Sequence, residues 1–156
     1  MRKYFKPAAA ALALLFAGAQ IVRPEVSSPP ADPSRGLEAR ARLTPEVREL
    51  LTRSCNDCHT RETRWPWYSR VAPVSWYVAD HVRHGRKHLD FSDWQQYESQ
   101  DIDGLLVGIC GEAERGTMPL RSYTLLHPEA TLTPTDVQTL CDWTERERAR
   151  LANRQS

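Results

Sequence analysis

Apolar side chains beyond residue 44 of this 156-residue chain recur at the spacing of an α-helix. The clearest case runs from Ile102 to Ala113, where apolar residues fall at i, i+3, i+4, i+7, i+8 and i+11 and predict a helix with one buried face. Shorter stripes of the same kind follow Pro45, Pro73 and Pro134. No stretch of useful length alternates apolar and polar residues as a half-buried strand does. The pattern therefore predicts a small all-α domain.

Local capping signals place the ends of these helices. Thr44-Pro45-Glu46 supplies an N-cap, a proline at the first helical position and an early negative charge. Thr133-Pro134-Thr135-Asp136 opens the last helix in the same way. Gly85 is predicted to end the helix that follows Pro73. Ser92-Asp93-Trp94-Gln95 is typical of a capping box that begins another helix.

Residues 1–22 have the pattern of a secretory signal, with a positive start followed by an apolar run over Ala8–Val22. The basic residues of that start are Arg2, Lys3 and Lys6. Ala17-Gly18-Ala19 offers a small-x-small cleavage site. At about 1.5 Å per residue, the run is shorter than the roughly 30 Å hydrocarbon core of a bilayer. We expect export, with residues 1–22 acting either as a cleaved signal peptide or as a membrane anchor.

Composition divides the rest of the chain into a linker and one domain. Prolines and serines dominate residues 23–36, and such a segment buries too little apolar surface to fold alone. Residues 37–156 have the size of a single domain. The first 23 residues carry four basic and no acidic groups, so the other 133 carry 17 basic and 20 acidic groups. That balance argues against a nucleic-acid partner, which requires a clustered basic surface.

The most specific motif is Cys55-Asn56-Asp57-Cys58-His59. Two thiols at this spacing reach the two vinyl groups of one haem, and the adjacent imidazole lies under the iron. A thioredoxin-like pair would follow a strand in a βαβ unit, which the pattern lacks. A zinc site would need a second Cys/His pair at suitable spacing. We expect one covalent haem c on Cys55 and Cys58, with His59 as proximal iron ligand, and a single motif excludes a two-haem peroxidase.

Met118 is the predicted distal iron ligand. It is the only methionine besides the initiator, and it lies in Gly116-Thr117-Met118-Pro119-Leu120, between a predicted helix and an irregular segment. A soft thioether on a proline-stiffened loop is what a His/Met haem uses. A loop methionine that packs on the core is the alternative. The rival ligands are the other histidines, namely His81 on an apolar stripe, His84 and His88 in a basic segment, and His127 before Pro128.

Five bulky or basic residues after the haem motif are candidates for the haem pocket. Trp65, Trp67 and Trp76 can wall the pocket and exclude water, which raises the haem potential. Arg64 and Arg70 can pair with the haem propionates. The aromatic residues can equally serve to enlarge the core of a small domain.

Cys110 and Cys141 remain, and each lies on the apolar stripe of a predicted helix. In an oxidising compartment, two leftover cysteines predict a disulfide where these helices pack. Two buried free thiols are the alternative.

Residues 54–143 resemble the small bacterial haem-binding domain family, and the order of motifs is similar to that of class I cytochrome c. The resemblance is carried by C-x-x-C-H, Glu62–Arg70, Val71–Trp76, His88–Trp94 and Gly116–Leu120 with Tyr123 and Leu126-His127-Pro128. It implies a cytochrome c-like helical domain wrapped around one covalent haem. It also implies a retained anchor, because the family tends to open with a hydrophobic segment and an Arg-Pro, as in Ile21-Val22-Arg23-Pro24.

Two functions are compatible with these residues. The first is one-electron transfer with redox partner proteins of the cell envelope, on the periplasmic side of the inner membrane, by a carrier rather than an enzyme. The second is a haem-based sensor or peroxidase-like enzyme with an open or histidine-ligated distal site. His81 near the iron would favour the second function, whereas a methionine that closes the sixth position argues against it.

Overall fold

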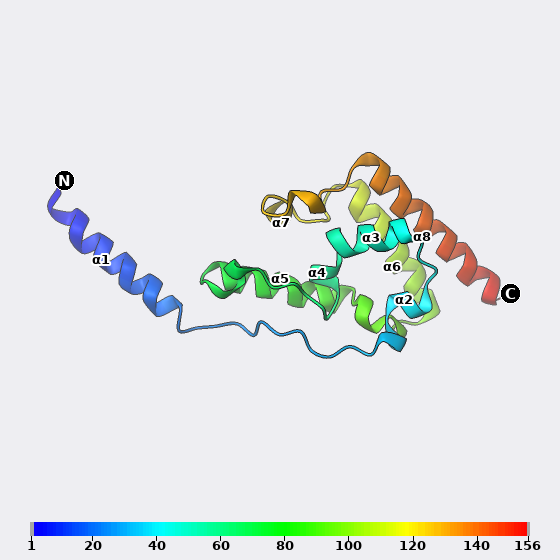
Figure 1. Ribbon diagram of the computed structural model, residues 1–156, viewed down its shortest axis with the longest axis horizontal. Coiled ribbons are helices and arrows are strands. Elements are labelled where there is room, and N and C mark those ends of the chain that lie inside the picture. Colours follow the sequence, from blue (N-terminus) through cyan, green and yellow to red (C-terminus); the bar gives the residue numbers. More distant parts are fainter. Residues whose placement is uncertain (1, 156) are drawn as a thin grey trace.

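The computed structural model describes residues 2–155, with side chains described for residues 6–154. The described part excludes Met1 and Ser156. It also excludes the side chains of Arg2 and Lys3, two of the basic residues of the predicted secretory signal. Between residues 2 and 155 every regular element is a helix, which confirms the predicted all-α class (Figure 1). The α-helices are α1 (Arg2–Ala19), α2 (Leu37–Arg40), α3 (Pro45–Ser54), α4 (Asn56–His59), α5 (Val74–His88), α6 (Ser99–Glu114), α7 (Arg121–Thr124) and α8 (Pro134–Gln155). The 3-10 helices are η1 (Pro33–Arg35), η2 (Trp67–Arg70), η3 (Phe91–Gln96) and η4 (Pro128–Ala130).

The predicted starts of α3 and α8 are confirmed by their caps. The Thr44 hydroxyl accepts a hydrogen bond from the Val47 amide at 3.3 Å. At α8 the capping is reciprocal, since the Thr133 hydroxyl accepts from the Asp136 amide at 3.2 Å and Asp136 accepts from the Thr133 amide at 2.8 Å. These two contacts satisfy backbone donors that the first helical turn leaves without a partner.

Two predicted helix ends are wrong. Helix α5 continues through Gly85 to His88, so Gly85 is an interior residue. Ser92 does not begin an α-helix; instead, Asp90 caps the 3-10 helix η3 by accepting from the Ser92 amide at 2.8 Å. In both places a tertiary contact decides the local structure, because Gly85 faces α4 and Asp90 is buried beneath Arg61.

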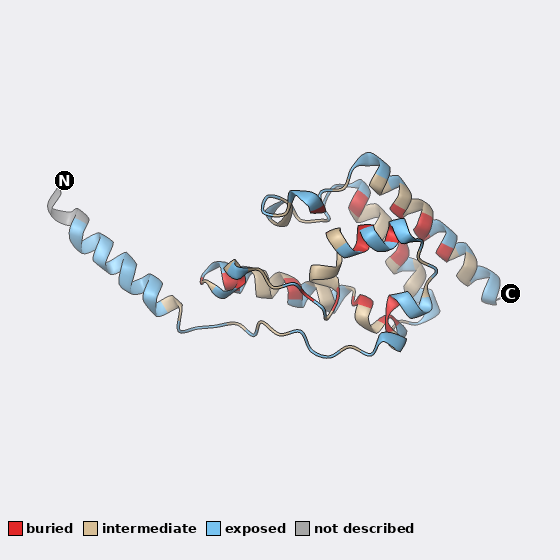
Figure 2. Ribbon diagram, viewed as in Figure 1, coloured by how far each residue is buried: buried red, intermediate tan, exposed pale blue. Residues whose placement is uncertain are grey.

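The main hydrophobic core lies where α3, α6 and α8 meet (Figure 2). Leu106 of α6, Val47 of α3 and Trp143 of α8 are almost completely buried. The Trp143 indole donates to the Arg42 carbonyl at 3.1 Å, which satisfies the one polar group of this side chain. This core supports one end of the candidate site, since Leu140 and Ala113 belong to it and also line a cavity described below.

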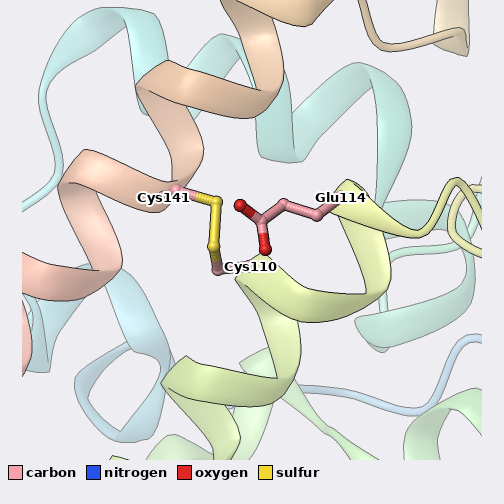
Figure 3. Close-up of side chains that lie close together, drawn as sticks. All are labelled: Cys110, Glu114 and Cys141. Atoms are coloured by element: carbon pink, nitrogen blue, oxygen red, sulfur yellow. A yellow bond between two sulfur atoms is a disulfide. The ribbon is translucent and has the colours of Figure 1, made fainter.

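Cys110 and Cys141 form a disulfide that joins α6 to α8, as the sequence predicts (Figure 3). Their Cα atoms lie 4.8 Å apart and the residues are 31 positions apart in the chain. Glu114 lies beside the two sulfurs. Because the sulfurs are bonded to each other, this cluster does not offer two thiolates to a metal.

The N-terminal segment has two different parts. Helix α1 is exposed over residues 6–18 and extends away from the other helices (Figure 1). Within residues 2–155, no helix has both the length and the apolarity needed to cross a membrane.

Residues 20–28, which follow α1 and include the first part of the linker predicted at residues 23–36, lie along α5 and the residues just before it. The Gln20 side chain pairs with both backbone groups of Ala72, at 3.2 Å and 3.0 Å. The Trp76 indole donates to the Val22 carbonyl at 2.7 Å, and the Trp65 indole donates to the Ser28 hydroxyl at 3.3 Å. We call residues 20–28 the strap.

Candidate functional site

The Cys55–His59 motif forms a short helix held between α3 and α5. Cys55 lies between the end of α3 and the start of α4 and caps both helices. Helix α5 passes close to this turn, so that a Cβ atom on Gly85 would lie 2.7 Å from the carbonyl oxygen of Cys58. A contact this short leaves room only for glycine, which explains why Gly85 stands inside a helix.

His59 is oriented by a backbone carbonyl. Its Nδ1 lies 2.9 Å from the Leu89 carbonyl oxygen, and because that oxygen can only accept, Nδ1 carries the proton and donates. Burial lowers the pKa of His59, although the hydrogen bond to Leu89 works in the opposite direction. The imidazole is therefore neutral at pH 7, and its Nε2 lone pair is the one available to a metal.

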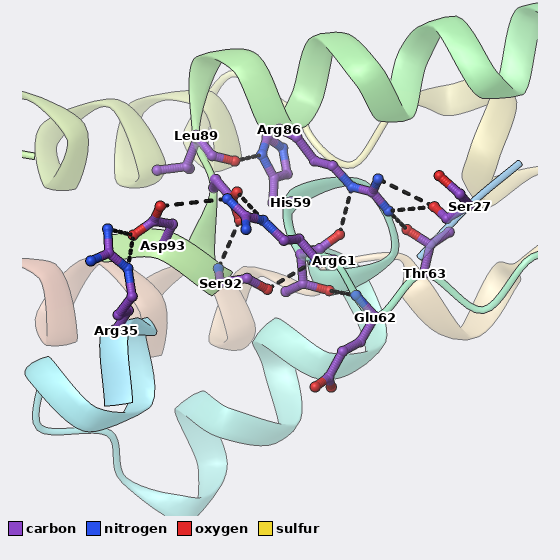
Figure 4. A network of polar contacts seen from close by, with 12 residues as sticks. Ser27, Arg35, His59, Arg61, Glu62, Thr63, Arg86, Leu89, Ser92 and Asp93 are labelled. Atoms are coloured by element: carbon purple, nitrogen blue, oxygen red, sulfur yellow. Dashed lines mark hydrogen bonds and ion pairs between the residues drawn. The ribbon is translucent and has the colours of Figure 1, made fainter. Parts of the chain in front are cut away.

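The loop that follows His59 is fixed by a polar network (Figure 4). Arg61 pairs with Asp90 at 3.1 Å and with Asp93 at 3.4 Å. Arg86 of α5 donates to the Thr60 carbonyl at 2.8 Å and to the Thr63 hydroxyl at 2.8 Å. These contacts bind the loop to η3 and α5, and so fix the backbone that follows His59.

Cys55 and Cys58 are the free cysteines among the described residues. Burial raises the pKa of Cys55 to about 12, and the neighbouring Cys58 adds to the effect. Burial and the adjacent Asp57 raise the pKa of Cys58 to about 11. Both sulfurs are therefore protonated thiols at neutral pH rather than thiolates.

Two cavities flank α4. The larger has a volume of about 370 Å³, within the usual range for cofactor sites, and brings together Cys55, His59 and Met118. The rest of its lining is mostly apolar: His88, Leu89, Phe91, Ile109, Glu112, Ala113, Pro119, Leu132 and Leu140. The smaller cavity, of about 220 Å³, is lined by Cys58, His81 and Leu120 together with residues of η2, α5 and α7. Both cavities are bounded by α4 and by the segment 118–120.

Met118 reaches the larger cavity because α6 ends in a left-handed glycine. Gly116 has φ +64°, and the Thr117 amide donates back to the Glu112 carbonyl at 3.1 Å, as in a Schellman cap. The Met118 amide donates to the same carbonyl at 3.2 Å. This turn directs the chain away from the α6 axis, so Met118 and His59 line one cavity although 59 positions separate them.

The predicted pocket residues are divided between different places. Arg64 borders the smaller cavity but is already paired with Asp57 at 3.0 Å. Trp65 and Trp76 line a separate cavity of about 530 Å³ beneath the strap, because their indole groups bond to strap residues. Trp67 is 77% exposed and Arg70 is exposed, and neither lines the two cavities beside α4.

The rival histidines are also separated. His88 lines the same cavity as His59, and His81 lines the smaller one. His84 lies 3.2 Å from Asp80 and borders neither cavity. His127 lies 2.8 Å from the Tyr68 hydroxyl and 3.2 Å from Glu129.

Sequence reasoning missed three contributions to the site. The Leu89 carbonyl carries no signal in the sequence, since every residue has one. The spacing of the motif assigns no role to Asp57, yet it accepts from the Tyr123 hydroxyl at 2.7 Å and pairs with Arg64. Burial, reinforced by the bond to Asp57, raises the pKa of Tyr123 well above its ordinary value, so its hydroxyl stays protonated and donates.

The residues present fit a haem. One largely apolar cavity is lined by His59, whose imidazole is neutral, by the Met118 thioether and by the protonated thiol of Cys55. The second thiol, Cys58, lies on α4 and lines the neighbouring smaller cavity. An all-helical domain with this donor set defines the class of helical haem-binding proteins.

The chain belongs to the haem-binding domain family, whose model matches residues 14–146. Searches of curated proteins and of solved structures found no significant match. The matched range includes the strap as well as α4 and the Met118 segment.

Proposed function

We propose that this protein carries one covalent c-type haem on Cys55 and Cys58, ligated by His59 and Met118, and transfers single electrons. The observation that carries the proposal is the shared cavity of His59 and Met118, with the His59 Nδ1 proton committed to Leu89. Bound haem supplies one-electron chemistry through its iron.

The two thiols are suited to the attachment reaction. Cys55 and Cys58 would hold the haem by adding their S–H groups across its two vinyl groups, with sulfur bonding to one vinyl carbon and hydrogen to the other, an addition that would need no oxidant. The reaction requires reduced cysteines, and Cys55 and Cys58 are free while Cys110 and Cys141 are paired with each other. The second cysteine pair is thereby kept from competing for Cys55 or Cys58.

The surrounding residues favour the reduced state of the iron. A thioether stabilises ferrous iron more than a second imidazole does, so Met118 raises the potential. Phe91, Ile109 and Leu140 on the cavity wall exclude water, which disfavours the additional charge of the ferric state. These features suit a carrier that exchanges electrons without a substrate at the iron.

We place the proposed carrier in the cell envelope, with other redox proteins as partners. The support is the signal-like pattern of residues 1–22 and the Cys110–Cys141 disulfide, which is typical of exported proteins. Haem attachment outside the cytoplasm agrees with both features.

His88 and His81 favour a second candidate function. His88 lines the cavity of His59, so a bis-histidine iron is possible there, and His81 lies beside Cys58 in the smaller cavity. Either arrangement leaves Met118 off the iron and corresponds to a sensor or peroxidase-like haem.

Visible spectra of the oxidised and reduced protein test the proposal. The wild type should show a c-type spectrum with a sulfur-to-iron charge-transfer band. Met118→Ala should lose this band, bind carbon monoxide or azide readily and have a lower potential, whereas Met118→His should stay closed at a lower potential. Lys87→Ala, an exposed change next to His88, serves as the control and should retain the wild-type spectrum. A wild type without the band, and an alanine variant identical to it, would support the second function instead.

A further inference from the structure

The segment that carries Met118 lies outside the main core. Residues 116–128, which we call the distal arm, leave α6 at Gly116 and return to the domain at η4. None of them belongs to the core cluster, and Leu125 and Leu126 are 82% and 57% exposed. Apolar burial alone therefore does little to fix the outer part of the distal arm.

Side-chain hydrogen bonds hold the distal arm against the rest of the domain. The Tyr123 hydroxyl donates to Asp57 at 2.7 Å, and Asp57 is one of the two residues between Cys55 and Cys58 and is adjacent to Cys58. Tyr68 of η2 lies 2.8 Å from His127 Nε2, and the His127 ring stacks on Tyr123 with 4.5 Å between centroids. The contact between Tyr123 and Asp57 thus joins the distal side of the site directly to the proximal motif.

Arg64 completes this contact. It pairs with both oxygens of Asp57, at 3.0 Å and 3.1 Å, and its backbone amide also donates to Asp57 at 3.2 Å. The Asp57 carboxylate is 13% exposed, so its charge is balanced by Arg64 while one oxygen still accepts from Tyr123. A hydrogen bond to an ionised acceptor is stronger than one between neutral groups.

We infer that Asp57, Arg64 and Tyr123 form a clasp that positions Met118 for ligation. This inference rests on the proposed His/Met ligation and names the residues that maintain it. Asp57 has a fixed place in the C-x-x-C-H helix, and Tyr123 follows Met118 by five positions, so their bond sets how far the distal arm can move from His59. These three are positioning residues, since they act on Met118 and not on the iron.

The test is Tyr123→Phe in the holoprotein, which removes only the hydroxyl. The charge-transfer band should weaken, and the fraction that binds azide rapidly should rise by about fivefold, which corresponds to about 1 kcal/mol for the lost hydrogen bond. Amide hydrogen exchange should become faster in residues 119–127 and stay unchanged in α8. Asp57→Asn, which keeps an acceptor, should have a smaller effect than Asp57→Ala.

Tyr97→Phe is the matched control. The Tyr97 hydroxyl accepts from the Asp90 amide at 2.8 Å across the two ends of η3, away from the distal arm, so its loss should leave the exchange of residues 119–127 unchanged. A Tyr123→Phe protein with wild-type ligation would overturn the inference, whether or not its distal arm exchanges faster. A wild type without methionine ligation would instead overturn the proposed function, and the exchange data would still show whether Tyr123 holds the distal arm.

Discussion

At Gly85, the absence of a side chain lets α5 approach the backbone of Cys58. A Cβ atom there would lie 2.7 Å from a carbonyl oxygen and 3.2 Å from its carbon. Backbone atoms cannot rotate away as a side chain does, so α4 and α5 would have to separate. We predict that Gly85→Ala lowers the free energy of unfolding by about 1–3 kcal/mol, as overpacking does, and reduces haem incorporation.

Gly104→Ala provides the matched control for this prediction. Gly104 also lies inside a helix, α6, but nothing lies within 4 Å of an added Cβ. There the substitution should stabilise the protein by about 0.5–1 kcal/mol, since alanine favours helix over glycine. Urea unfolding of both variants checks the pair, and equal effects would contradict the packing explanation.

Single residues also show how far sequence reasoning reaches. Residue types and spacing single out Cys55, His59 and Met118 as candidates for binding haem, and the structure brings all three to one cavity. Trp65 and Trp76 illustrate the opposite case, because the sequence indicates their bulk but not their direction. Their indole groups bond to residues 37 and 54 positions away, and no local pattern encodes such a contact.

At the scale of elements, the disulfide between α6 and α8 constrains the unfolded chain. Closing a loop over 31 positions corresponds to about 3–4 kcal/mol in the chain-entropy model. The double variant Cys110→Ala/Cys141→Ala should therefore have a free energy of unfolding lower by about this amount, and should unfold at a lower denaturant concentration. Reduced wild type should behave like the variant, and unreduced peptides should contain the Cys110–Cys141 link; free thiols at both positions would refute the prediction.

The start of α8 is joined to α3 by an ion pair that depends on pH. Arg53 lies 2.7 Å from Asp136. Burial raises the pKa of Asp136, but hydrogen bonds from Thr133 and Arg53 outweigh it and hold the pKa below its ordinary value. A lowered pKa in the folded state means that this stability is present at neutral pH and is lost as the pH falls below about 4.

Asp136→Asn tests this dependence, because it keeps a capping acceptor and removes the charge. At pH 7 the variant should be less stable by about 1 kcal/mol or less, as for a partly exposed pair. Between pH 5 and pH 3 the wild type should lose more stability than the variant does, as measured by urea unfolding at each pH. Parallel pH profiles would show that Asp136 contributes no acid sensitivity.

The helices themselves were largely predictable from the chain. The apolar period identified α3, α5, α6 and α8, since each buries one face. The irregular segments were less accessible, because the distal arm, η3 and the strap are fixed by side-chain hydrogen bonds between distant residues. Gly85 shows the same limit within a helix, where a glycine that looks like a stop is required by a neighbour.

At the scale of the whole molecule, the strap joins the N-terminal segment to the haem-binding part. The double variant Gln20→Ala/Trp76→Phe removes two sets of hydrogen bonds that hold the strap. Gln20→Ala removes the bonds to the backbone of Ala72, and Trp76→Phe removes the bond to the Val22 carbonyl. We predict faster proteolysis within residues 20–31 and little change in the unfolding free energy of the helical core. Arg154→Ala, an exposed change on α8, should leave the cleavage rate at wild-type level. Cleavage of the double variant at that same rate would mean that these bonds do not hold the strap.

A docked strap also limits how far the haem-binding part can move relative to α1. A free, flexible chain of the strap's length, nine residues, would let its ends separate by roughly 17 Å on average and in any direction. Held along α5, the same residues become part of the folded body, so α1 and the cavities beside α4 turn together. If α1 is bound to a surface, the haem-binding part would then keep one orientation relative to that surface. The effective concentration seen by a partner on the same surface would depend on this orientation and not on the length of a flexible linker.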